Sequence, residues 1–189
     1  IDSSSWYPLV ILACLKSSIH IVGLLLAHGA DINSVGPIGE SCLYACCERG
    51  HSALASFCIE RGAEIDKTSD DDCVPLHMAC EGGHCLVIEV LIKAGASIAP
   101  RRSDGATALY IACQKGRVDA ANLLLNHGAA IESADRWGST SLHSACGNDH
   151  VHVVNLLLER GAKVDCRDNE GITPLYMTAF SRELMTPFP

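Results

Sequence analysis

Two stretches of sequence decide the fold: Gly171-Ile-Thr-Pro-Leu-Tyr-Met-Thr-Ala179 and its counterpart Asp72-Cys-Val-Pro-Leu-His-Met-Ala-Cys80. In each, a proline is followed by apolar and small residues, and in the later stretch Thr173 precedes the proline. Proline suits the first position of a helix, and threonine is a good cap just before it. Both stretches therefore predict a short helix that begins at the proline.

The surroundings of these stretches recur every 33 residues along the whole chain. Gly-Ala pairs follow the period at 29–30, 62–63, 95–96, 128–129 and 161–162. A Gly or Asp recurs with the same spacing at Gly39, Asp72, Gly105, Gly138 and Gly171. A fixed period of this length indicates a repeat array, in which single units cannot bury their apolar faces and stacked neighbours share a core.

These motifs resemble those of ankyrin repeats. The two opening stretches resemble the T-P-L-H-x-A signature, and Gly50-His51, Gly83-His84 and Gly29-Ala-Asp-Ile-Asn33 resemble other landmarks of the family. The resemblance implies an all-α repeat solenoid of stacked helix-turn-helix units with short β-hairpin fingers. It also implies a protein-protein interaction module, without catalysis of its own, that binds a partner protein along hairpin tips and first helices.

The period defines the repeat boundaries. We predict a degenerate first repeat that caps the N-terminal end, four regular repeats and a partial sixth, over residues 3–35, 36–68, 69–101, 102–134, 135–167 and 168–189. Gly at the C-terminal end of each second helix predicts a left-handed cap. Asp149 stands where other repeats have a turn glycine, so we expect a costlier turn there. Ser4-Ser-Trp6 replaces the first hairpin glycine, and Pro187-Phe-Pro189 leaves no second helix in the last repeat.

Composition excludes several classes of function. The 189 residues include 14 Lys and Arg and 22 Asp and Glu, a formal net charge of −8. An acidic chain is a poor match for nucleic acid or anionic lipid, which both need basic patches. Mean hydropathy is +0.20, but no apolar run approaches the roughly 18 residues of a membrane span, so we expect no membrane insertion. The chain has 11 cysteines and no C-x-x-C pair, which favours free thiols and an intracellular, cytoplasmic location.

The cysteines and histidines raise an alternative of another class, a metal or redox protein. Five cysteines share one slot of the repeat: Cys14, Cys47, Cys80, Cys113 and Cys146. Adjacent helices pack about 8–10 Å apart, whereas two sulfurs on one zinc lie within about 4.6 Å, so the ladder predicts buried small residues without a metal or cofactor. Cys42 and Cys46 form a helical pair that His77 or Cys73 could complete. The spacings of His77 with Cys80 and His143 with Cys146 mimic a Cys–His dyad, but a slot that also accepts Tyr favours hydrogen bonds between hairpins.

The repeat register places candidate partner-binding residues on hairpin tips and first helices. The repeat has no structural need for a tryptophan at a solvent-facing tip, where the register places Trp137. Trp and Arg are favoured residues at binding hot spots. The alternative is that Trp137 folds onto a neighbouring hairpin and that the charges are merely solvated. Acidic and basic tips together favour a partner of mixed charge. The predicted binding residues are Trp137, Arg136, Asp70, Asp71, Arg101, Asp104, Lys115, Glu48, Arg49 and Glu81.

Two further expectations concern the context of the chain. Asn33 resembles the asparagine that is β-hydroxylated in some ankyrin repeats, whereas the equivalent positions in other repeats carry different residues. The short last repeat indicates a piece of a longer scaffold, channel or ubiquitin-ligase substrate-recruiting protein, and otherwise we expect a monomer.

Overall fold

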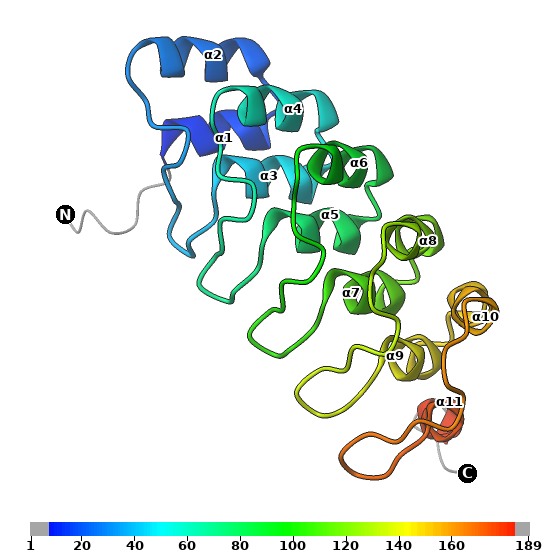
Figure 1. Cartoon of the computed structure of the whole chain (residues 1–189). Coiled ribbons are helices and arrows are strands. Elements are labelled where there is room, and N and C mark those ends of the chain that lie inside the picture. The colour runs from blue at the N-terminus through cyan, green and yellow to red at the C-terminus, as the bar shows by residue number, and fades with distance from the viewer. Residues whose placement is uncertain (1–7, 184–189) are drawn as a thin grey trace. The chain divides into compact units, whose positions relative to one another are not determined.

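The computed structural model describes residues 8–183, which form helices joined by turns and finger-like loops in two compact units, Ile1–Ser97 and Ile98–Pro189 (Figure 1). Ser4-Ser-Trp6 and Pro187-Phe-Pro189 lie outside the described residues. Unit 1 contains α1 (Leu9–Leu15), α2 (Ile19–Ala27), α3 (Cys42–Arg49), α4 (Ser52–Glu60), α5 (Pro75–Gly82) and α6 (Cys85–Lys93). Unit 2 contains α7 (Ala108–Gln114), α8 (Val118–Asn126), α9 (Ser141–Gly147), α10 (Val151–Glu159) and α11 (Pro174–Glu183).

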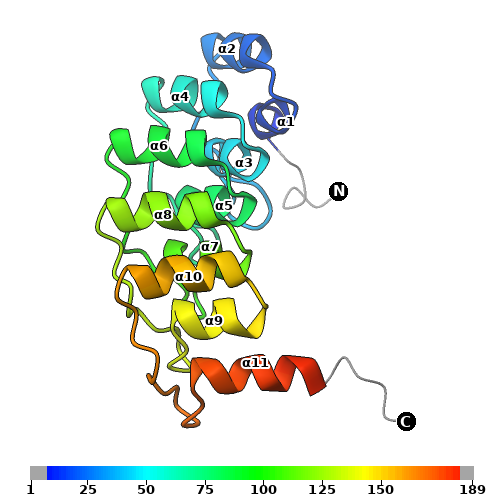
Figure 2. The same cartoon turned by 90° about the vertical axis from the view of Figure 1, so that its right-hand side faces the viewer.

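Within each unit the helices form antiparallel pairs that stack on one another. In unit 1, α3 packs between α1 and α5 and also against its own partner α4, while α4 packs on α6. Unit 2 repeats this arrangement, with α9 between α7 and α11 and α8 beside α10 (Figure 2). The all-α repeat architecture is therefore confirmed.

The first helices begin where the sequence predicted. Pro75 and Pro174 open α5 and α11. The Ser41 hydroxyl accepts a hydrogen bond from the Tyr44 N–H at 3.2 Å, and the Thr107 hydroxyl does the same for Tyr110. Each cap satisfies a backbone donor that has no partner inside the helix.

The turns need backbone conformations that most residues avoid. Gly128 closes α8 with a φ of +87°, as the left-handed cap predicts. Asp149, between α9 and α10, has a φ of +56°, which confirms that a residue with a side chain occupies a left-handed turn there.

The fingers connect each second helix to the next first helix, over residues 35–41, 68–74, 101–107, 134–140 and 167–173. They are less regular than β-hairpins. Three of them carry a single antiparallel bridge at the base, formed by Val35 with Ser41, Arg101 with Thr107 and Ala134 with Thr140. A finger of this length has room for one β-bridge before the chain turns.

The cores contain leucines from both helices of a repeat, together with small residues from the first helices. Leu54 and Leu91 are buried in unit 1, and Leu124 and Leu157 in unit 2. The predicted cysteine ladder is buried in the first helices, next to alanines such as Ala79 and Ala112. Small side chains there let neighbouring first helices approach closely.

Candidate protein-binding site

The fingers over 134–140 and 167–173 in unit 2 are built alike around an aspartate. Asp135 Oδ1 accepts hydrogen bonds from the N–H groups of Trp137 and Ser139, both at 2.9 Å. Asp168 Oδ1 accepts from Glu170 at 3.0 Å and from Ile172 at 2.9 Å. An aspartate that binds its own backbone two and four residues on fixes the turn, so each tip is held in one conformation.

Neighbouring finger tips also bind each other. The Asn169 N–H donates to the Trp137 carbonyl at 2.9 Å, and its side-chain amide donates to the Arg136 carbonyl at 3.1 Å. The Arg136 N–H donates in turn to the Asp104 carbonyl at 3.0 Å. The tips of unit 2 therefore form a continuous hydrogen-bonded row.

Trp137 stands at the tip of its finger with 52% of its surface exposed. The Arg136 guanidinium carbon lies 4.1 Å from the centre of the indole ring, a cation–π contact that covers one face of the ring. The backbone of Trp137, through its carbonyl, makes the link to the next finger.

A cavity of about 590 Å³ lies beside Trp137, and Tyr110 contributes to its lining. Burial raises the pKa of Tyr110, so its phenol stays protonated. The described residues that line the cavity include aromatic and apolar side chains and three carboxylates but no Lys or Arg. We name this cavity the acidic groove and define it by Trp137, Tyr176, Met177, Asp135, Asp168 and Glu170.

The comparison with known families decides the identity of the array. A family model described as ankyrin repeats (3 copies) matches residues 9–102, 43–135, 96–168 and 131–185. The chain belongs to the ankyrin-repeat family. Ankyrin repeats are generally protein-protein interaction modules, and the family is generally non-enzymatic. No curated protein matches the chain. Among the residues that the structure describes, no helix has the length and apolar character that crossing a bilayer requires.

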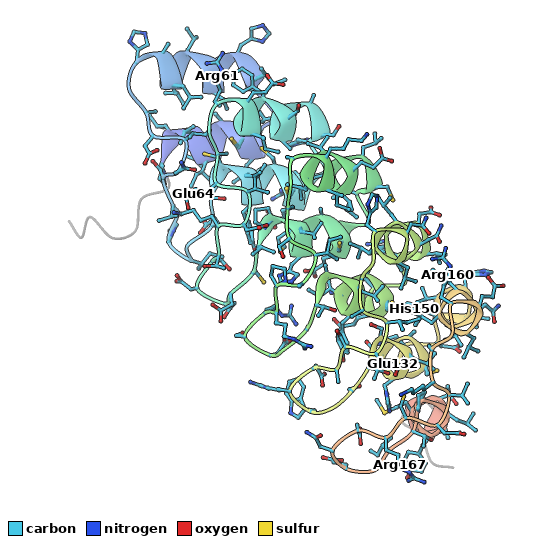
Figure 3. The ribbon with its side chains drawn as sticks, in the orientation of Figure 1. Arg61, Glu64, Glu132, His150, Arg160 and Arg167 are labelled. Atoms are coloured by element: carbon cyan, nitrogen blue, oxygen red, sulfur yellow. The ribbon has the colours of Figure 1, made fainter. Side chains whose placement is uncertain are left out.

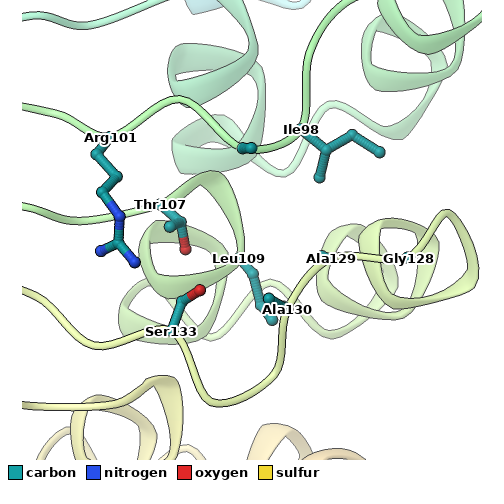
Figure 4. Close-up of a pocket in the computed structure, with 9 residues that line it drawn as sticks. Ile98, Arg101, Thr107, Leu109, Gly128, Ala129, Ala130 and Ser133 are labelled. Atoms are coloured by element: carbon teal, nitrogen blue, oxygen red, sulfur yellow. The ribbon is translucent and has the colours of Figure 1, made fainter.

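Two of the predicted binding residues, Arg101 and Asp104, are engaged in hydrogen bonds within this ankyrin array. Arg101 Nη1 donates to the carbonyls of Gly105 and Ala134, at 2.9 and 2.6 Å, and so ties its finger to the next. The Arg102 guanidinium beside Asp104 lowers the pKa of that carboxyl, which also accepts the Ala106 N–H at 3.0 Å. Figure 4 shows Arg101 at a smaller cavity of about 240 Å³. Both side chains stabilise the fingers.

The other predicted residues are not among those that line the acidic groove. Asp70 and Asp71 are exposed on a finger of unit 1, Glu48 and Arg49 form an exposed ion pair at 3.7 Å, and Glu81 is half-buried on α5. Lys115 is exposed at the end of α7. Their role in binding stays a prediction.

Sequence reasoning did not single out the residues that complete the groove with Trp137. The register placed Asn169, Glu170 and Ile172 on a tip, but no charge cluster or aromatic pair marks them in the linear sequence. Tyr176 stands in the signature's His slot, where a structural role is the usual expectation. Two fingers become neighbours only when the repeats stack. The repeat register, combined with the acidic residues on two successive tips, could have revealed the groove.

The histidines of the array act as connectors between repeats. His143 Nδ1 accepts the Thr140 N–H at 3.1 Å, and its Nε2 lies 3.0 Å from the Ile172 carbonyl. His150 Nε2, on the turn before α10, lies 2.9 Å from the Gln114 carbonyl (Figure 3). One ring nitrogen of His143 thus caps its own helix and the other reaches the next finger, which agrees with the predicted structural role of this slot.

Asn33 forms one of several clasps between successive loops. Its amide donates to the Gly62 carbonyl at 3.1 Å and accepts the Glu64 N–H at 2.9 Å. Glu132 makes a similar clasp by accepting the Lys163 N–H at 2.8 Å. Hydroxylation of Asn33 stays a prediction.

The donor set best suited to a metal lies in unit 1. The sulfurs of Cys14, Cys46 and Cys58 all lie within 4.8 Å of one another, and all three residues are fully buried. This trio shares only Cys14 with the cysteine ladder, and only Cys46 with the set of Cys42, Cys46 and His77 or Cys73 that the sequence suggested.

Proposed function

We propose that the protein binds an extended segment of a partner protein in the acidic groove, through a basic side chain flanked by apolar ones. The single observation that carries this proposal is the composition of the groove, which combines exposed Trp137 and Tyr176 with carboxylates and has no basic residue in its described lining. A Lys or Arg side chain matches both features, because its alkyl stem packs on aromatic rings while its head pairs with carboxylates.

Rigidity supports this proposal. The hydrogen bonds that Asp135 and Asp168 accept from their own fingers fix both tips before a partner arrives, so little loop entropy is lost on binding. Asp168 uses one carboxylate oxygen for its turn, and Glu170 is exposed at the rim. The volume of about 590 Å³ lies within the range of specific pockets, roughly 300–1,000 Å³.

Binding, rather than catalysis, is the role that we assign to this site. The mixed-charge partner that the sequence favoured is narrowed here to a basic segment, because Arg136 is engaged with Trp137 and Arg101 with backbone carbonyls. The groove itself therefore presents acidic groups.

Selection from a displayed random-peptide library tests the proposal directly. We expect enriched peptides to carry Lys or Arg next to apolar residues. Trp137→Ala should weaken the binding of a selected peptide by about 2 kcal/mol, as for an interface hot spot. Glu170→Lys should weaken it as well, because it places a like charge at the rim.

Matched variants outside the groove control for general effects. Leu86 on α6 is an exposed apolar residue, and Glu159 on α10 is an exposed acid. Leu86→Ala and Glu159→Lys should leave binding unchanged. Selection of acidic peptides, or equal affinity for wild type and Trp137→Ala, would overturn the proposal.

A further inference from the structure

We propose that unit 1 holds a structural zinc site formed by Cys14, Cys46 and Cys58, with Cys42 as the fourth ligand. The three sulfurs of the trio come from three helices, and α3 packs against both α1 and α4. They meet at one point although the residues are far apart in the sequence.

The distances match those of a thiolate site. Around one zinc with Zn–S bonds of about 2.3 Å, tetrahedral geometry puts sulfurs about 3.8 Å apart. The sulfurs of Cys46 and Cys58 are 4.0 Å apart, and every pair in the trio lies within 4.8 Å. Binding therefore requires side-chain adjustments of only tenths of an ångström to about one ångström.

We assign the fourth ligand to Cys42, because burial keeps water away from the trio. Structural zinc is four-coordinate, and a fully enclosed trio leaves no approach for a water ligand. Cys42 is also fully buried and lies one helical turn before Cys46 on α3. Residues one turn apart on a helix have Cβ atoms about 5–6 Å apart, so a change of rotamer brings the Cys42 sulfur towards that of Cys46.

The chemistry of the donors selects a soft cation. Thiolates favour zinc and copper(I), whereas magnesium and calcium need oxygen ligands. Each thiol that coordinates loses its proton to solvent, so four ligands release four protons per zinc and affinity rises with pH.

A bound ion would connect the first repeat to the second. Cys14 belongs to α1, whereas the remaining ligands belong to α3 and α4 of the next repeat. A metal cross-link between successive repeats would add stability that the shared core does not supply. The site lies in unit 1 and is independent of the acidic groove in unit 2.

Cobalt(II) substitution is the decisive experiment. The purified chain, kept reduced and free of oxygen, is titrated with Co²⁺ and then with Zn²⁺. We expect thiolate-to-cobalt charge-transfer absorption and visible bands of tetrahedral cobalt at one metal per chain, bleached by Zn²⁺. Cys58→Ala should abolish these bands, while Cys47→Ala, which removes a neighbouring buried thiol on α3, should retain them.

Alkylation of wild-type protein keeps the test valid if a variant fails to fold. We expect Zn²⁺ to slow modification of Cys14, Cys42, Cys46 and Cys58, read by mass spectrometry, and to leave Cys113 in unit 2 unaffected. Absence of the cobalt bands together with unchanged alkylation of the four thiols would overturn the site. Cobalt bands and protection that persist in Cys42→Ala would overturn the assignment of the fourth ligand.

Discussion

At single residues, the turn between the two helices of a repeat depends on glycine for two reasons. Gly116 has a φ of +68°, a conformation that costs an ordinary residue about 1–2 kcal/mol. A Cβ at this position would also lie 2.8 Å from Nδ1 of His150, the ring that binds the Gln114 carbonyl. Gly116 is therefore required both by the conformation of the turn and by the contact with the next repeat.

Paired alanine substitutions separate these two costs. Gly128 also has a positive φ, +87°, but a Cβ there meets no atom within 4 Å. We expect Gly128→Ala to lose only the backbone term, whereas Gly116→Ala should lose about 1–3 kcal/mol more because His150 must move. Urea unfolding of both variants measures the difference. Equal losses would show that the histidine contact carries no energy.

Residue-level prediction succeeded where one position has one dominant cause. Proline, threonine and glycine set the helix ends through local geometry, so Thr107 and Asp149 behave as their types predict. The Cys14, Cys46 and Cys58 trio has no such local signal. Its sulfurs meet through packing of three helices, whereas spacing along the sequence indicates only the five-residue ladder and the helical pair of Cys42 and Cys46.

At the level of elements, α7 is a first helix of unit 2 that is almost entirely buried. Of its seven residues, all but Gln114 are buried. Burial raises the pKa of Cys113 to about 12. Burial also raises the pKa of Tyr110 on the same helix, so the helix is most stable when both groups are protonated.

This burial predicts alkaline destabilisation with a defined sign. An unfolded cysteine ionises near pH 9, whereas folded Cys113 keeps its proton to about pH 12. The unfolded state therefore loses its proton first, and stability should fall by about 1.4 kcal/mol per pH unit for this group between these values. Denaturant unfolding at several alkaline pH values, with reductant present, checks this. Cys113→Ala should show a shallower decline, and an unchanged slope would contradict the burial argument.

The elements themselves were more predictable than the fingers. Helix positions follow from the 33-residue period, which repeats in every described unit. The expected β-hairpins are reduced to single bridges, because the aspartate-centred turns at Asp135 and Asp168 take up backbone donors that a ladder would otherwise use.

On the scale of the whole molecule, the net charge of −8 and the acidic groove both favour a basic partner. Composition predicted that nucleic acid and anionic lipid are poor partners, and this charge also favours approach of a basic segment from a distance. The groove could not be predicted from composition, since Trp137 and Glu170 are brought together only by two stacked fingers.

Salt dependence separates the long-range and contact contributions to binding. We expect the affinity of a selected basic peptide to fall on the order of tenfold between low and high ionic strength, mainly through slower association. Glu170→Gln should reduce both the affinity and its dependence on salt. Trp137→Ala should reduce the affinity while leaving the salt dependence unchanged, because the indole contributes apolar contact. Binding rates measured by surface plasmon resonance test all three outcomes, and a salt-independent wild type would show that the carboxylates of the groove do not attract the partner.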